Sequence, residues 1–292
     1  MEGRESVSRI GIWANLDKQQ AGVLTRQLCH WLGERGVETV LLPAAADAVG
    51  LAGSGVDPSH PAWGEVKFVV VLGGDGTLLN AARRLAAYNR PLMGVNLGHL
   101  GFLTEVEVPD LYPALTAFLA GHYVLDERMT LHARVVRGNQ PVWDVQALND
   151  VVITKGPFAR LVSLETFVDD AYVTTYPADG LILSTPTGST AYSLSAGGPV
   201  ASPSLDVMVL TPICPHSFFD RSIVLGGTAR VRVRIRAEHR ETLLTVDGQE
   251  GFPLQDSDEI HVEANPDRVG LMRRPEWNFY HVLRAWRRGR EV

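Results

Sequence analysis

The sequence predicts two domains, an α/β domain with a parallel sheet followed by a β-rich domain. Its 292 residues exceed the roughly 100–200 of a typical single domain. Residues 68–72 are an apolar, β-branched run without alternation, as expected for a parallel strand buried on both faces. Residues 131–137 and 230–236 instead alternate apolar and polar side chains, which indicates an antiparallel sheet with one exposed face.

The first half alternates strands and helices at short spacing, which is typical of a parallel α/β sheet. We expect strands at 10–14, 37–42, 68–72 and 91–96, and helices at 19–33, from Thr77, and at 110–121. The Ala-, Gly- and Pro-rich stretch 43–64 is predicted to be a loop. We place the α/β domain at 1–126, the β-rich domain at 127–274 and a C-terminal tail at 275–292. The tail is apolar enough to pack on a domain, and its arginines are typical of a solvated face.

The composition excludes several classes of protein. Hydrophobic residues make up 45% and charged residues 21% of the chain, as in folded globular proteins rather than disordered ones. A net charge of −6 offers no basic surface for nucleic acid. No apolar run approaches the ~20 residues of a membrane span, and residues 1–30 do not read as a signal peptide. The isolated Cys29 and Cys214 indicate neither a disulfide framework nor a zinc site. We therefore expect a cytoplasmic protein without membrane or nucleic-acid partners.

The most chemically informative segment is the run Gly73-Gly-Asp-Gly-Thr77 between the buried strand and the next helix. A glycine turn lets the backbone approach a ligand, and the free N–H groups of a helix start bind phosphate. Asp75 either caps the helix or takes part in phosphoryl transfer. The run fits neither the Walker loop nor the redox GxGxxG fingerprint. A second Gly-rich segment, Asn96 to Gly101, follows the next strand and should lie at the same sheet edge, unless both are ordinary tight turns.

Two features stand out in the β-rich half. Asn149-Asp150 precedes an apolar strand and could bind ribose hydroxyls or an amide group, although a plain turn is the alternative. The stretch Asp179 to Pro199 combines many hydroxyls with small residues and Tyr192, which suits sugar hydroxyls and a heterocycle, although a solvated loop is the alternative. Ser189 and Ser195 lack the GxSxG context of a hydrolase, and the nine histidines show no metal-binding spacing.

These motifs resemble the NAD kinases in their order and separation, from about Ile10 to Gln249. The Gly73–Thr77 element alone is shared with lipid kinases of the diacylglycerol type and, more loosely, with phosphofructokinases. The stretch Thr185–Pro199 is far more specific, and Asn96-x-Gly-x-x-Gly-Phe-Leu103 adds to it. The resemblance implies transfer of the γ-phosphoryl group of ATP, or of polyphosphate in some relatives, to the adenosine-ribose 2′-hydroxyl of NAD. It also implies a divalent cation such as Mg²⁺, a homodimer or homotetramer, and a tail that returns to the first domain.

Site residues follow from the resemblance position by position. Asp75 is implied as the proton acceptor facing the 2′-hydroxyl, with Gly76 beside it. Asn149 and Asp150 would hold the ribose and base, and Asp179 the nicotinamide end. The adenine and ribose pocket would be lined by Thr190, Ala191, Tyr192, Ser193, Leu194 and Ser195, with further NAD contacts from Arg160 and Gln249. The phosphate-binding residues would be Gly73, Gly74, Gly76, Thr77, Asn96 and Gly98.

One position departs from the family pattern, because some relatives carry a basic residue where this chain has Asn80. Three other functions remain as alternatives. A kinase of the same motif could act on a lipid or sugar hydroxyl, and an NAD-binding regulator could lack turnover. A redox dehydrogenase would bind NAD without consuming ATP, but the missing GxGxxG counts against it.

Overall fold

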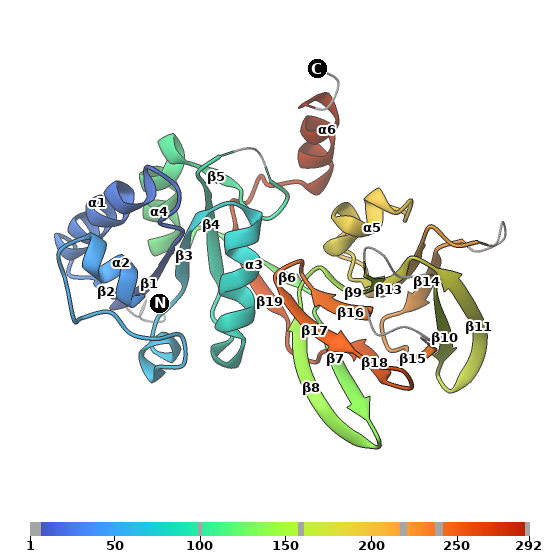
Figure 1. The fold of residues 1–292 in the computed structure, drawn as a ribbon. Helices are drawn as coiled ribbons and strands as arrows, with labels where there is room; N and C mark the ends of the chain where they lie inside the picture. The colour runs from blue at the N-terminus through green and yellow to red at the C-terminus, as the bar shows by residue number, and fades with distance from the viewer. Residues whose placement is uncertain (1–6, 99–100, 157–160, 217–220, 237–241, 290–292) are drawn as a thin grey trace. The chain divides into compact units, whose positions relative to one another are not determined.

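The computed structural model describes residues 7–98, 101–156, 161–216, 221–236 and 242–289 (Figure 1). The chain forms two compact units, residues 1–127 with 269–292, and residues 128–268. The first unit is α/β and the second is β-rich, which confirms the predicted fold class. Across the described residues, no helix combines the length and the apolar character that a membrane crossing requires.

The first unit is built on a seven-stranded sheet with the order β2-β1-β3-β4-β19-β6, and β5 pairs with β4. The registered pairs that join β1 to β2 and β3, and β4 to β3, β5 and β19, are all parallel. The strands are β1 (Arg9–Ala14), β2 (Glu38–Leu41), β3 (Val69–Gly73), β4 (Leu92–Asn96), β5 (Val106–Glu107), β6 (Val124–Arg128) and β19 (Val269–Arg273).

Helices cover both faces of this sheet. The apolar sides of α1 and α4 share one core with Ile12, Val70 and Val95 of the strands. Gly94, which alternates with these positions, faces Leu78 of α3, so α3 lies on the opposite face. The helices of the unit are α1 (Ala21–Gly33), α2 (Pro43–Ala48), α3 (Asp75–Arg84), α4 (Leu111–Leu119), α6 (Phe279–Gly289) and the 3-10 turns η1 (Pro61–Gly64), η2 (Ala86–Tyr88) and η3 (Val108–Asp110).

Two segments differ from the sequence pattern. The expected loop at 43–64 contains α2 and η1, each of which begins with a proline whose fixed φ suits a first helical position. Residues 269–273, which the pattern grouped with the β-rich domain, form β19 and pair with β4 of the first unit through Leu271 and Leu92. Local periodicity identifies a strand but not the sheet that it joins, because pairing partners can be distant in sequence.

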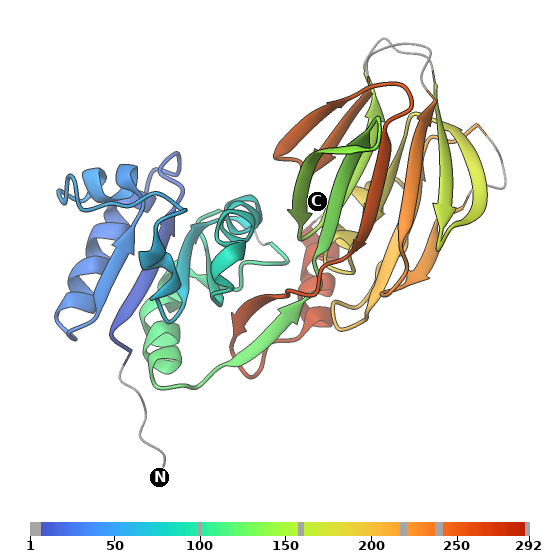
Figure 2. The same ribbon diagram turned by 90° about the horizontal axis from the view of Figure 1, so that it is seen from below.

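The second unit is a sandwich of two six-stranded antiparallel sheets (Figure 2). One sheet has the order β11-β10-β15-β18-β7-β8 and the other β14-β13-β12-β9-β16-β17. The strands of the first are β7 (Leu131–Arg137), β8 (Gln140–Ala147), β10 (Val162–Val168), β11 (Ala171–Ala178), β15 (Val231–Arg236) and β18 (Glu259–Ala264). Those of the second are β9 (Asp150–Lys155), β12 (Gly180–Ser184), β13 (Val207–Ile213), β14 (Ile223–Gly226), β16 (Thr242–Val246) and β17 (Glu250–Leu254).

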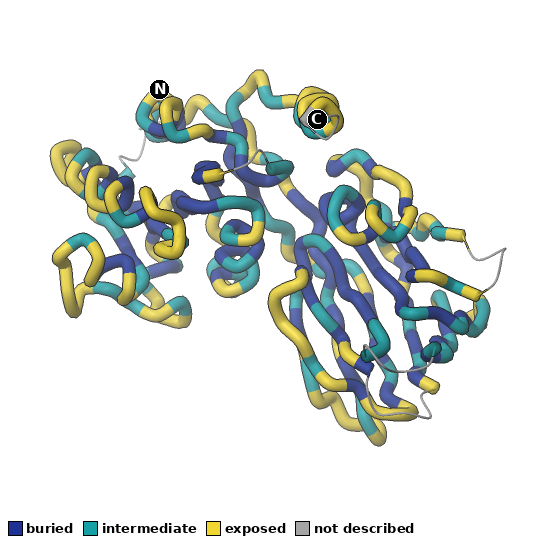
Figure 3. The backbone as a smooth tube through the Cα atoms, turned by 45° about the horizontal axis from the view of Figure 1, so that its top comes forward, coloured by how far each residue is buried: buried dark blue, intermediate teal, exposed yellow. Residues whose placement is uncertain are grey.

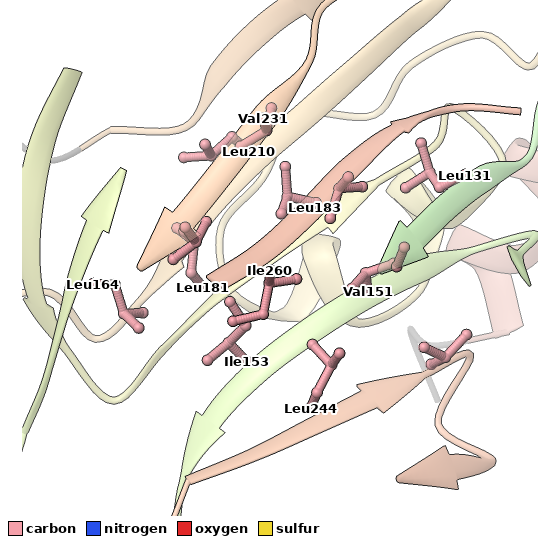
Figure 4. Close-up of a cluster of buried hydrophobic side chains, with 14 of the residues drawn as sticks. Leu131, Val151, Ile153, Leu164, Leu181, Leu183, Leu210, Val231, Leu244 and Ile260 are labelled. Carbon is pink, nitrogen blue, oxygen red and sulfur yellow. The ribbon is translucent and has the colours of Figure 1, made fainter. Parts of the chain in front are cut away.

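The core of the sandwich lies between its sheets, where side chains such as Leu131, Leu164 and Ile260 of one sheet meet Ile153 and Leu183 of the other (Figure 4). The burial pattern follows the strands, whose inner positions are buried while many of the turns that join them are exposed (Figure 3). Two short helical segments, η4 (Gly188–Thr190) and α5 (Tyr192–Ser195), follow β12 and lie within the hydroxyl-rich stretch.

Candidate active site

The glycine turn lies where β3 ends and α3 begins. Gly73 is the last residue of β3, Gly74 is the N-cap of α3 with an extended backbone, and Asp75 is the first helical residue. Gly73 and Asn96 are register partners on the adjacent parallel strands β3 and β4. The predicted phosphate-binding residues therefore gather at the carboxyl edge of the sheet, next to the N-terminus of a ten-residue helix.

The carboxylate of Asp75 does not cap its own helix, because the N-cap is Gly74 and Asp75 is already the first helical residue. Instead it accepts four hydrogen bonds from the segment 102–104. Oδ2 accepts from the N–H of Phe102 at 2.7 Å, and Oδ1 accepts from the N–H of Leu103 at 3.1 Å, the N–H of Thr104 at 3.0 Å and Thr104 Oγ1 at 3.1 Å. A Cβ added at Gly101 would overlap Oδ1, so only glycine allows this close approach. The capping interpretation of Asp75 is thus excluded.

The second Gly-rich segment is ordered by its own amide. Asn96 is buried, and its Oδ1 accepts the N–H of Gly98 at 2.9 Å, while the N–H of Leu97 donates to the carbonyl of Gly73 at 2.9 Å. Lys18, in the loop between β1 and α1, approaches the same segment, with Nζ 4.0 Å from the position that a Cβ would take at Gly98. The chain thus has a cation at this edge, although Asn80 supplies none.

In the second unit, Asp247 organises the Asn149-Asp150 pair. Its carboxylate accepts the backbone N–H groups of Leu148 at 3.1 Å, Asn149 at 2.7 Å and Asp150 at 3.2 Å. Asp247 and Gly248 both have positive φ, 50° and 64°, and form the tight turn between β16 and β17. This turn fixes the start of β9 through Asp247, and the exposed Gln249 is part of the same turn, its N–H donating to the carbonyl of Val246 at 2.9 Å.

Asp150 is buried, with 4% of the residue exposed. Burial, together with the nearby charge of Asp247, raises the pKa of Asp150 to about 7. The proton is therefore retained to near-neutral pH, where the group can donate a hydrogen bond as well as accept one. Such a shift in a polar turn is a common property of functional sites.

The hydroxyl-rich stretch is ordered rather than solvated, because several of its hydroxyl groups form hydrogen bonds within the protein. Thr185 Oγ1 donates to the carbonyl of Leu148 at 2.6 Å and accepts the N–H of Gly188 at 3.0 Å. A Cβ at Gly188 would overlap the carbonyl oxygen of Asn149, so the stretch packs directly on the Asn149-Asp150 turn. Ser193 is buried and shares a hydrogen bond with Thr211 at 3.1 Å.

The remaining predicted residues of the stretch differ in exposure. Tyr192 is 45% exposed and Ser195 is exposed, whereas Thr190, Ala191 and Leu194 are half-buried. Asp179 follows β11 and pairs with Lys155 at 3.3 Å. Arg160 lies outside the described residues.

The polar residues that hold or approach the site but were absent from the sequence prediction include Lys18, Thr104, Asp247 and Arg273. The Asp-Gly pair at 247–248 is a signal for a tight hairpin turn, but it does not reveal which N–H groups the carboxylate would accept. Lys18, Thr104 and Arg273 are distant in sequence from the residues that they approach, so only the folded chain reveals them.

A glycine turn that opens a helix at the carboxyl edge of a parallel sheet binds phosphate, and a carboxylate in that turn can accept a proton from a nucleophile. The fold and the site thus define a phosphotransferase of the α/β class.

Comparison with known proteins gives the family. The ATP-NAD kinase N-terminal domain matches residues 59–123, and the ATP-NAD kinase C-terminal domain matches residues 148–273. NAD kinase from Moorella thermoacetica is 47% identical over 95% of this chain and 88% of its own length, and that from Symbiobacterium thermophilum is 47% identical over 92% and 95%. The chain belongs to the ATP-NAD kinase family, which confirms the resemblance seen in its motifs.

Two solved structures share the fold. Yeast NADH kinase complexed with NADH has a TM-score of 0.83 at 24% identity, with 96% of this chain and 87% of that chain covered. An NAD kinase from Archaeoglobus fulgidus in complex with ATP has a TM-score of 0.71 at 22% identity, with 95% of this chain and 98% of that chain covered. The likeness extends through both units.

Proposed function

We propose that this chain is an NAD kinase that transfers the γ-phosphoryl group of ATP to the 2′-hydroxyl of the adenosine ribose of NAD, giving NADP. The observation that carries the proposal is the carboxylate of Asp75, which lies at the phosphate-binding edge of the sheet and is oriented by segment 102–104 rather than by its own helix. The family membership of the chain supports the choice of NAD as acceptor.

Asp75 is the proton acceptor of this reaction. Oδ1 accepts three hydrogen bonds, whereas Oδ2 accepts one from the described residues and so retains a lone pair for a substrate hydroxyl. The carboxylate is a weak base toward a sugar hydroxyl, but phosphoryl transfer passes through a loose transition state that does not need early deprotonation. Positioning of the hydroxyl is therefore the main contribution of Asp75.

The phosphates of the donor bind to Gly73, Gly74, Gly76, Thr77, Asn96 and Gly98. The first turn of α3 lies at this edge and adds the positive end of the helix dipole. Lys18 adds a cation beside Gly98. Polyphosphate could bind to the same N–H groups and cation, because it presents the same kind of phosphate oxygens as ATP.

The reaction requires a divalent cation, which we propose to be Mg²⁺ on the donor phosphates. The described residues contain no group of three or more His, Cys, Asp or Glu that could hold a metal ion, so the residues present fit a cation that arrives with the nucleotide rather than a protein cage. Such a cation neutralises charge that develops on the transferred phosphoryl group. Among the site residues, Asp75 is the carboxylate nearest to the proposed phosphate positions.

NAD binds to the second unit through Asn149 and Asp150, with Gln249 at the adjacent turn. At neutral pH the half-protonated Asp150 offers both donor and acceptor to a ribose or base. The exposed ring of Tyr192 offers a stacking face, with Thr190, Ala191, Ser193, Leu194 and Ser195 around it. Asp179 and Arg160 complete the proposed contacts.

A homo-oligomer is supported by apolar side chains on the edge strands of the sandwich. Tyr172 and Val173 of β11 are 58% and 38% exposed, and Val224 of β14 is 56% exposed. Exposed edges of this kind are usually covered in the assembled protein. Both cysteines are free, which suits the reducing cytoplasm.

The proposal is tested with purified protein, Mg²⁺-ATP and NAD, coupling any NADP formed to an NADP-specific dehydrogenase. Asp75→Asn should lower kcat by about 10²–10⁴ while NAD binding, measured by calorimetry, stays nearly intact. Asp57→Asn, an exposed carboxylate remote from the turn in sequence, serves as the control and should keep full turnover. Unchanged turnover in the Asp75 variant would refute its assignment, and phosphate incorporation into a lipid or sugar instead of NAD would refute the substrate.

A further inference from the structure

The peptide groups that hold the carboxylate of Asp75 are held at their other ends by Arg273. The N–H of Leu103 shares a peptide group with the C=O of Phe102, and the N–H of Thr104 shares one with the C=O of Leu103. These two N–H groups donate to Asp75 Oδ1 at 3.1 and 3.0 Å. The two C=O groups accept from Arg273, at 3.4 Å from Nη2 and 2.9 Å from Nη1. Two hydrogen-bonded paths therefore run side by side from the carboxylate through a peptide to the guanidinium.

The charges at the two ends match the dipoles of these peptides. Each N–H, the positive end of the peptide dipole, faces Asp75, and each C=O, the negative end, faces Arg273. Hydrogen bonds in such a chain polarise and strengthen one another, most of all where water is excluded. Arg273 therefore stabilises the orientation of the very N–H groups that fix the carboxylate.

Arg273 is itself immobilised. It ends β19 and is 2% exposed. Its Nε donates to Asp126 Oδ2 at 3.2 Å, its Nη1 lies 3.8 Å from Glu105 Oε2, and its guanidinium lies 4.4 Å from the centre of the Trp277 ring. A buried guanidinium with these contacts has little freedom to move, so it holds the carbonyl groups of Phe102 and Leu103 in fixed positions.

We propose that Arg273 is a positioning residue for phosphoryl transfer, acting on Asp75 through the peptide groups of residues 102–104. The inference rests on the proposed role of Asp75 as proton acceptor. Misplacement of a reacting group by about 1 Å can cost on the order of 10²-fold in rate. Because Arg273 acts on the reacting geometry and not on bound NAD or ATP, its loss should lower kcat and leave both KM values in place.

The test is a double-mutant cycle of Arg273→Lys with Asp75→Asn, with kcat and KM measured for each protein. In the wild-type background, Arg273→Lys should lower kcat about 10- to 100-fold with KM for NAD and ATP within about threefold. In the Asp75→Asn background it should lower the residual kcat less than about threefold, because the group that it positions is gone. Arg274→Lys is the matched control, since Arg274 pairs with Glu105 and Asp110 without contacting these carbonyls, and it should leave kcat unchanged.

A second variant covers the case in which Arg273→Lys does not fold. Asp126→Ala removes the acceptor of Arg273 Nε at a position whose side chain is only 19% exposed, and it should lower kcat about three- to tenfold with the same suppression in the Asp75→Asn background. An equal loss of kcat in both backgrounds, a raised KM with unchanged kcat, or an unaffected kcat in the folded variants would overturn the positioning role. Full activity of Asp75→Asn alone would overturn both the proposed proton acceptor and this inference. If Asp75→Asn is impaired but the effects of the Arg273 and Asp75 substitutions on kcat simply multiply, only the inference is overturned.

Discussion

Replacing the buried carboxyl of Asp150 with an amide should remove a distinct pH dependence from the stability of the protein. The pKa of this group is about 7 in the folded chain and 3.8 in an ordinary environment, owing to its burial and to the charge of Asp247. Between these values the native state holds a proton that the unfolded chain has released. The unfolding free energy contributed by Asp150 is therefore fully present below about pH 3.8 and is lost as the pH rises through about 7.

The magnitude follows from the size of this shift. One proton held by the native state alone gives a slope of about −1.4 kcal/mol per pH unit. Over the roughly three units between the two pKa values the total is on the order of 4 kcal/mol. Because Asp150 is almost fully buried, solvent does little to screen this effect.

Urea denaturation of the wild type and of Asp150→Asn at pH 5, 6, 7 and 8 measures the effect. The difference between the two unfolding free energies should fall by about 1.4 kcal/mol per unit between pH 5 and 6 and level off above about pH 8, since other titrating groups cancel in the subtraction. Asn149→Ser, a neighbouring change without a titrating group, should give a difference that does not vary with pH. A constant difference for Asp150→Asn as well would show that its carboxyl titrates normally and that the turn is open to water.

Three further predictions concern other parts of the site and the core. Lys18→Met should raise KM for ATP about tenfold at nearly constant kcat, because it removes a cation beside the phosphate-binding segment, and initial rates across an ATP series measure it. Gly101→Ala should lower kcat at least about 10²-fold, because the new Cβ displaces the carboxylate of Asp75. Leu183→Ala should lower the unfolding free energy by about 2–5 kcal/mol in urea titrations, since the side chain is fully buried in the sandwich.

The Gly101 and Leu183 variants each have a matched control in the chain. Gly22→Ala places a Cβ where no atom lies within 4 Å, so kcat should be unaffected and the helix slightly stabilised. Leu243→Ala removes a side chain that is 40% exposed and should cost less than Leu183→Ala. Equal effects in a variant and its control would contradict the structural reason given. For Lys18, a raised KM for NAD with an unchanged KM for ATP would place the cation elsewhere.

Local pattern identified much of the first unit. The apolar run at 68–72, the glycine turn and the helical spacing after it predicted β3 and α3 to within about two residues, because neighbouring residues alone determine those elements. The alternating segments at 131–137 and 230–236 likewise became β7 and β15. The motifs were also sufficient to recognise the family, since the hydroxyl-rich stretch has a distinctive order of residues.

Tertiary structure alone decided what holds these motifs in place. Asp75 could have capped its helix by every local criterion, and only the folded chain shows that segment 102–104 takes its carboxylate. Arg273 lies 170 residues beyond Leu103, yet the two are joined because β19 pairs with β4 across the sheet. Asp247 meets Asn149 across the pairing of β16 with β9. Such contacts depend on which strands become neighbours, and that choice is made by packing over the whole domain rather than by any stretch of residues that can be inspected on its own.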